Sequence, residues 1–68
     1  MTAEDYENEV NALLAMHADD RDPEAFHAES DGLIAAGLAM IVAGTDDPGC
    51  VASAALKLSR SELTRWYA

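Results

Sequence analysis

Residues 22–48, DPEAFHAESDGLIAAGLAMIVAGTDDP, decide the fold of this chain. The stretch opens with Asp22-Pro23-Glu24, which combines a capping carboxylate, a proline at the first helical position and an acid in the first turn. It closes with Gly44, which is placed to end a helix, and with Asp46-Asp47-Pro48, which repeats the start signal. The pattern predicts a helix from Pro23 to about Ala43 and another helix after the second proline.

The helix expected over residues 23–43 has an apolar stripe, and its second half is apolar on nearly every side. Leu38, Met40 and Val42 lie away from the stripe. We expect this half to be enclosed by other helices or by a second subunit. The apolar run 32–44 is shorter than the ~20 residues of a membrane span, which predicts a buried core helix and no membrane contact. The stripe consists of Phe26, Leu33, Ile34 and Ile41, with Ser30 and Gly37 between them.

Helices are also expected before and after this stretch. Thr2 can cap the first, with acids in its first turn where the helix dipole favours carboxylates, and that helix should end near Ala18. The last helix is either continuous or broken at Ser59, where Ser59-x-x-Glu62 can cap a short separate segment. The expected apolar faces are Tyr6, Val10, Leu13, Leu14 and His17 on the first helix, and Val51, Ala55, Leu58 and Trp66 on the last.

These signals predict an all-α fold in one domain over residues 1–68. The architecture is a small three-helix bundle, with or without a short fourth C-terminal helical segment. A chain of 68 residues buries only ~60% of the surface that its unfolded form exposes, so its core is marginal. A partner or a second copy would stabilise it.

Charge excludes several classes of function. The net charge is −9 and the chain holds only four Lys and Arg residues, which argues against direct binding of nucleic acid and against anionic membrane surfaces. The acids concentrate in residues 1–31, whereas residues 50–68 are net basic. A lone Cys50 and an acidic, amphipathic N-terminus without a signal-peptide pattern predict a reducing cytoplasm. We expect no cofactor.

One cluster of side chains suggests metal chemistry. Glu24, His27 and Asp31 share one helix face and could hold a divalent ion, with His17 as a fourth ligand. The alternative, which we favour, is a polar patch at a helix start, where carboxylates are expected from the dipole alone. Cys50 is read as a small buried residue rather than a nucleophile. Trp66 either closes the core or is an exposed interface anchor.

Two segments resemble small acidic proteins encoded by bacteriophages of actinobacteria. They are Asp22-Pro-Glu-Ala-Phe-His27-Ala-Glu29-Ser-Asp31-Gly-Leu33 and the closing Arg65-Trp66-Tyr67-Ala68. Those proteins carry His-x-Glu-x-Asp before a leucine-rich helix and end in Trp-Tyr-Ala. The resemblance covers roughly the last two-thirds of the chain. It implies a phage origin and a host cytoplasm, and it supplies no catalytic residue.

The leading hypothesis is therefore a non-enzymatic protein that binds a host protein through an acidic helical face, as an inhibitor, a modulator or a mimic of DNA charge. One alternative is a metal-dependent hydrolase-like domain that uses Glu24, His27 and Asp31. Another is a structural homo-oligomer in which the small residues Ala36, Gly37, Ala39 and Ala43 allow close packing of two copies. The expected partner-binding residues are Glu4, Glu7, Glu9, Asp19, Asp20, Asp22, Glu24, Glu29, Asp31 and Trp66.

Overall fold

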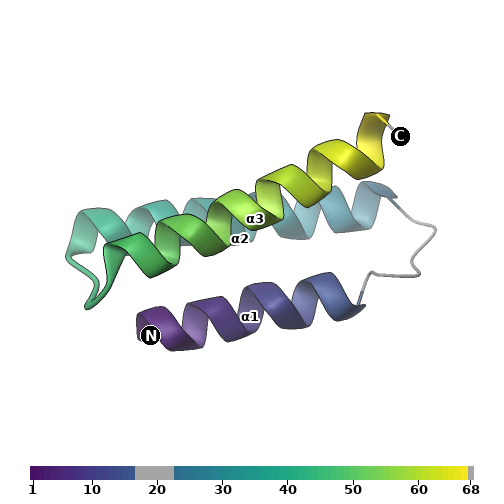
Figure 1. The fold of residues 1–68 in the computed structure, drawn as a ribbon. Helices are drawn as coiled ribbons and strands as arrows, with labels where there is room; N and C mark the ends of the chain where they lie inside the picture. The colour runs from purple at the N-terminus through teal and green to yellow at the C-terminus, as the bar shows by residue number, and fades with distance from the viewer. Residues whose placement is uncertain (17–22, 68) are drawn as a thin grey trace.

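Three α-helices make up the part of the chain that the structure, a computed structural model, describes, namely residues 1–16 and 23–67. They are α1 (Ala3–Met16), α2 (Pro23–Ala43) and α3 (Pro48–Tyr67) (Figure 1). Side chains are described for residues 1–16 and 24–61, and no strand occurs in the described ranges. The all-α three-helix bundle is confirmed. The backbone of α3 runs on through Ser59 to Tyr67, so the last helix is continuous.

Local signals start α1 as expected. The N–H of Asp5 donates to Oγ1 of Thr2 at 3.1 Å, and the N–H of Thr2 donates to Oδ2 of Asp5 at 3.1 Å. This reciprocal pair is a capping box, with aspartate in the position where glutamate is usual. The predicted Thr2 cap is confirmed. Residues 17 and 18, where the end of this helix was expected, lie outside the described ranges.

The turn between α2 and α3 also follows its sequence signals. Gly44 has φ +89°, in the left-handed region that side chains disfavour. Its N–H donates to the Ile41 carbonyl at 3.2 Å, and the N–H of Thr45 donates to the Met40 carbonyl at 3.0 Å, which completes a Schellman motif. Oδ1 of Asp47 then accepts from the N–H of Cys50 at 3.0 Å and caps α3.

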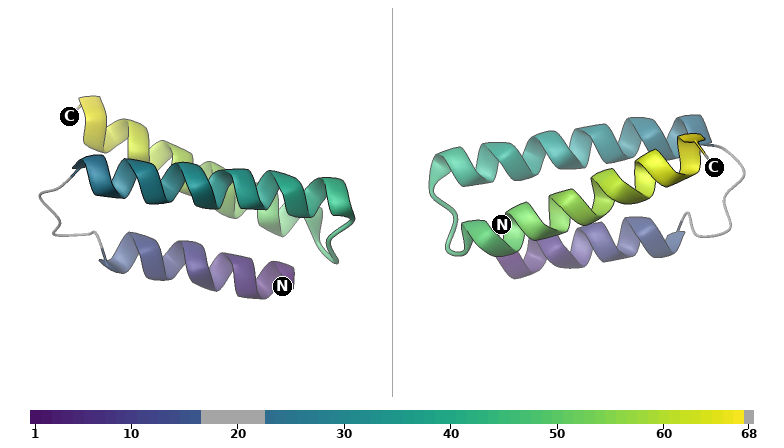
Figure 2. Two further views of the ribbon diagram at one scale, coloured as in Figure 1. Left: turned by 180° about the vertical axis from the view of Figure 1, so that it is seen from behind. Right: turned by 45° about the horizontal axis from the view of Figure 1, so that its top comes forward.

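The core lies where the three helices face one another. α3 packs against both α1 and α2, whereas α1 and α2 contact each other over a much smaller region. Figure 2 shows α2 and α3 as an antiparallel pair with α1 alongside. The predicted faces of α1 and α3 are confirmed for the side chains that the structure describes, which leaves out His17 and Trp66. The buried residues are Ala3, Tyr6, Val10, Leu13, Phe26, Ser30, Val51, Ala54, Ala55 and Leu58.

The apolar half of α2 is less enclosed than expected. Its inner stripe is covered by α1 and α3, but Leu38 is 58% exposed and Val42 is 89% exposed. The expectation of a buried core helix is therefore wrong for the outer side, because two neighbouring helices cannot surround a third. By length and composition Glu24–Ala43 could also cross a membrane, a property that core helices of soluble proteins share. Only 17% of its most apolar window is buried in the bundle.

Candidate functional site

The side chain of Tyr6 connects α1 to α2. The Tyr6 hydroxyl donates to the backbone carbonyl of Leu33 at 2.7 Å, and Tyr6 is fully buried. A Cβ on Gly37 would meet the phenol oxygen and ring carbon of Tyr6, so only glycine permits this approach. Burial, and then the Glu9 carboxylate, raise the pKa of Tyr6. The contact holds the two helices together at one point.

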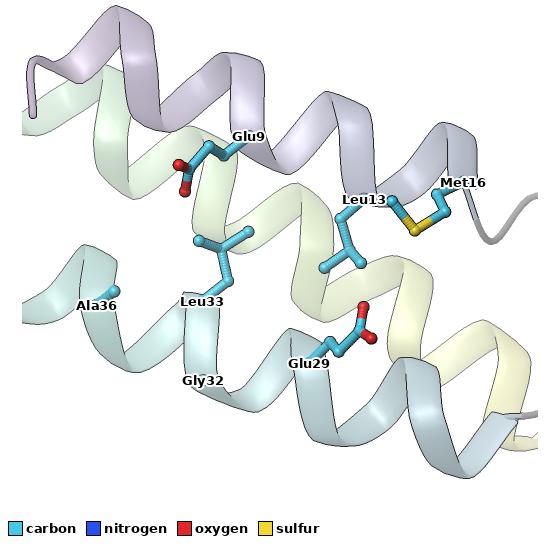
Figure 3. A pocket seen from close by; sticks show the side chains of 7 residues that line it. All are labelled: Glu9, Leu13, Met16, Glu29, Gly32, Leu33 and Ala36. Atoms are coloured by element: carbon cyan, nitrogen blue, oxygen red, sulfur yellow. The ribbon is translucent and has the colours of Figure 1, made fainter.

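Farther along, α1 and α2 leave a groove of about 410 Å³ between them. Leu13 projects from α1 and Leu33 from α2 into the space between the helices, and both belong to the apolar cluster of the bundle (Figure 3). Gly32 offers no side chain, and a Cβ built there would touch nothing. The floor of the groove is apolar, and the groove is largely open to solvent. It is lined by Glu9, Leu13, Met16, Glu29, Gly32, Leu33 and Ala36.

Two carboxylates flank this apolar floor. Glu9 extends from α1 and Glu29 from α2 into the space between the helices (Figure 3). Both residues are exposed. The groove thus presents an apolar centre between two negative groups, a combination that suits a ligand with an apolar surface and positive charge.

The other predicted acidic residues lie elsewhere. Glu4 and Glu7 are exposed on α1 at the side of α3, where both raise the pKa of the Cys50 thiol. Glu24 and Asp31 are exposed on α2. The structure therefore brings Glu9 and Glu29 together at the groove and places these four residues outside its lining. Three predicted acids, Asp19, Asp20 and Asp22, and the side chain of Trp66 fall outside the described residues.

Two of the candidate metal ligands, His27 and Asp31, lie next to each other on α2. Nε2 of His27 lies 3.3 Å from Oδ2 of Asp31, one helical turn away. Among the side chains of residues 1–16 and 24–61, no three His, Cys, Asp or Glu groups lie close enough together to hold a metal ion. His17, the proposed fourth ligand, is outside those ranges. The contact supports the polar patch that we favoured at the start of this helix.

Cys50 packs between the starts of α1 and α3. Its Sγ lies 3.9 Å from the Ala3 carbonyl oxygen, and the residue is half-buried. Burial raises the pKa of the thiol, and the carboxylates of Glu7, Asp47, Asp46 and Glu4 raise it further. Because the thiolate is the nucleophile, a raised pKa lowers the reactive fraction of this cysteine at neutral pH. The structure favours a packing role, as the sequence did.

Sequence reasoning missed the groove and one long-range cap. Met16 follows Leu13 by three residues, and Ala36 follows Gly32 by four, so the large and the small lining residues each share a helix face. That spacing was the available signal. Oδ1 of Asp46 also accepts from the N–H of Ala3 at 2.9 Å, which ties the turn before α3 to the start of α1. No local pattern predicts that bond.

Comparison of the chain with protein-family models, with curated proteins and with solved structures gave no match.

Proposed function

We propose that this chain is a protein-binding module that holds a basic amphipathic segment of a partner in the α1–α2 groove. The observation that carries the proposal is the apolar floor at Leu13 and Leu33 between the carboxylates of Glu9 and Glu29. A helix that lays leucine-like side chains into such a floor can place lysine or arginine beside the two acids. The partner is thus recognised by shape and by charge.

The charge of the whole chain supports a basic partner. A net charge of −9 on 68 residues creates a negative potential that attracts positive surfaces and raises the rate of encounter. The resemblance to actinobacteriophage proteins supports a host protein as the partner. Proteins that bind nucleic acid carry basic patches, so a host protein of this class is the natural target for an acidic inhibitor, modulator or mimic of DNA charge.

Titration with a designed peptide tests the groove directly. The probe is a helical peptide of leucine and lysine with one apolar face, and the comparison peptide has the same composition in scrambled order. We expect calorimetry to detect binding of the first alone, with an affinity that falls as salt is added. Equal binding of the two peptides would contradict recognition by the groove, because net charge alone would then suffice.

Two substitutions on α2 locate the binding site. Ala36→Leu fills the groove from an exposed position and should abolish peptide binding, while the far-UV circular dichroism stays unchanged. Ala28→Leu is the matched control, since Ala28 is exposed on the same helix and does not line the groove. Loss of binding in the control variant, or retained binding in Ala36→Leu, would place the peptide elsewhere.

A second pair of variants tests the charge. Glu9→Gln removes one flanking carboxylate and should weaken binding about two- to fivefold, the usual range for an exposed ion pair. Glu4→Gln removes the same charge from α1 outside the groove, so it should change affinity less. Equal effects would show that only the net charge matters.

A photo-crosslinker at position 36 then identifies the partner in an actinobacterial lysate. The same crosslinker at position 28 is the control, because it reports proteins that merely collide with the acidic surface. A basic protein captured only from position 36 would be the host partner. Capture of identical proteins from both positions would contradict the proposed site.

A further inference from the structure

The second half of α2 and the first half of α3 form an apolar outer surface without charged residues, and it is separate from the groove. Leu38 and Leu56 line a shallow apolar depression of about 230 Å³ between the two helices, and both are more than half exposed. Val42 stands one turn beyond Leu38 and is 89% exposed. We call this surface the outer face. It consists of the exposed residues Leu38 and Val42 on α2 and Ala52 and Leu56 on α3, and it is bordered by Ile34 and Ile41, which pack partly against the core.

We infer that the outer face binds a second copy of this chain and forms a symmetric dimer. The occupant follows from the distribution of charge. Residues 32–45 and 48–56 contain no Asp, Glu, Lys or Arg, and residues 32–45 are the longest uncharged run in the sequence. Two copies that each carry −9 repel one another wherever carboxylates meet. The outer face is where they can meet without placing carboxylates side by side.

A stable dimer buries a sizeable part of the surface of a chain this small. A standard interface buries about 800 Å² on each partner, and the whole chain exposes 4335 Å². Burial of Leu38, Val42 and Leu56 supplies the apolar contact that favours association.

The charges on α2 also set the relative orientation of the two copies in the dimer. Glu24 and Asp31 lie in the first half of the helix, and the second half is uncharged. Parallel packing of two α2 helices would set each of these acids beside its own copy. Antiparallel packing centred near Leu38 overlaps only the uncharged halves and opposes the two helix dipoles. The dimer is therefore antiparallel along α2.

This arrangement leaves the α1–α2 groove of each copy open to solvent. Gly32, Leu33 and Ala36 line the groove on the side of α2 that faces α1, whereas Leu38 and Ile41 line the depression beside α3. The dimer does not depend on the proposed groove function. If both hold, the dimer presents two acidic grooves and can bind two basic segments of one target with increased avidity.

Sedimentation equilibrium of the full chain at moderate salt tests the dimer. We expect the mass to rise from 7.2 kDa towards twice that value as the concentration increases from about 1 µM to about 1 mM. Val42→Glu and Leu38→Glu should each remain monomeric and fully helical, because both positions are exposed. Met16→Glu is the control, since it adds the same charge at an exposed apolar residue outside the face and should still dimerise.

Three outcomes would overturn the inference. One is a monomer mass at every concentration, and another is an equal loss of dimer in Met16→Glu and Val42→Glu. The third is a monomer that floats with vesicles of zwitterionic lipid, which would make the outer face a membrane contact. Peptide binding by Val42→Glu is measured in parallel, so a failure of the dimer is distinguishable from a failure of the groove.

A distance between spin labels tests the orientation. The label is attached to Glu24→Cys in a Cys50→Ala background, which removes the native thiol. Antiparallel packing centred on Leu38 places the two labels about 40 Å apart, whereas parallel packing places them about 10 Å apart. The longer distance supports the antiparallel dimer, and the shorter distance contradicts it.

Discussion

The inner and outer faces of α2 are built from similar side chains and have different surroundings. On the inner face Phe26 is buried and Gly37 lies against Tyr6, whereas on the outer face Leu38 and Val42 remain exposed. Hydrophobicity along the helix therefore does not report burial. What distinguishes the faces is the presence of α1 and α3 on one side, and that depends on residues far away in the sequence.

The largest expected effect is a truncation on the inner face. Phe26→Ala removes a large side chain that is 1% exposed and should destabilise the fold by about 3–5 kcal/mol. For a small domain this is enough to unfold much of the population. Val42→Ala, measured at a concentration where the chain is monomeric, should change stability by less than about 0.5 kcal/mol. Thermal melts followed by circular dichroism check both, and similar losses would contradict the difference between the faces.

A second pair of variants compares two glycines on the same helix. Gly37→Ala places a methyl group against the buried phenol of Tyr6 and should destabilise the fold by about 1–2 kcal/mol, even after the gain in helix propensity. Gly32→Ala meets nothing and should stabilise by about 0.5–1 kcal/mol. Chemical denaturation of both variants checks the opposite signs. Stabilisation by Gly37→Ala would show that Tyr6 can move aside at little cost.

These glycines also show what the sequence could predict. The helix starts at Pro23 and Pro48 and the end at Gly44 follow from residues within one turn of each signal, and all three are confirmed. The apolar faces follow from spacing within a helix. Nothing local distinguishes Gly37 from Gly32, because the phenol that meets Gly37 belongs to Tyr6, on another helix.

The site was harder to predict than the fold for the same reason. Glu9 and Glu29 were predicted to bind a partner only as members of a large set of acids. Their position on either side of Leu33 depends on how α1 packs against α2. The sequence left open whether other helices or a second subunit cover the second half of α2, because an apolar pattern is equally compatible with burial in the bundle and with burial in a dimer.

Ser30 tests the polar part of the inner face. Its side chain is fully buried, at 0% exposure, and its Oγ has no hydrogen-bond partner in the described part of the chain. A buried hydroxyl without a partner is unfavourable. Ser30→Ala should therefore stabilise the fold by about 1 kcal/mol, and Ser53→Ala, at an exposed position on α3, should give less. Destabilisation in urea titrations would show that the hydroxyl has a favourable role.

Tyr6 connects α1 to the inner face of α2 and makes the stability of the fold depend on pH. Tyr6→Phe removes the hydrogen bond to the Leu33 carbonyl and should cost about 1 kcal/mol near neutral pH. The pKa of Tyr6 is raised above its usual value of 10.0, mainly by burial. The stabilising effect of the protonated phenol is complete below pH 10 and is lost as pH rises through the higher folded value. Melting temperatures measured on both sides of pH 10 should fall more steeply for the wild type than for Tyr6→Phe.

The smallest expected effect is at Asp46, beside the turn where both faces of α2 end. The N–H of Ala3, and then the Thr45 hydroxyl, hold the pKa of Asp46 below its usual value of 3.8. A lowered folded pKa stabilises the fold above the unfolded value, and the stabilisation disappears as pH falls through the folded value. Asp46→Ala should lower the melting temperature at neutral pH and flatten its decline in acid. Asp46→Asn keeps an acceptor for Ala3 without a titrating charge, so it should retain part of the neutral stability and show the same flat acid limb. If the melting temperatures of both variants fall in acid as steeply as that of the wild type, the decline is due to other carboxylates.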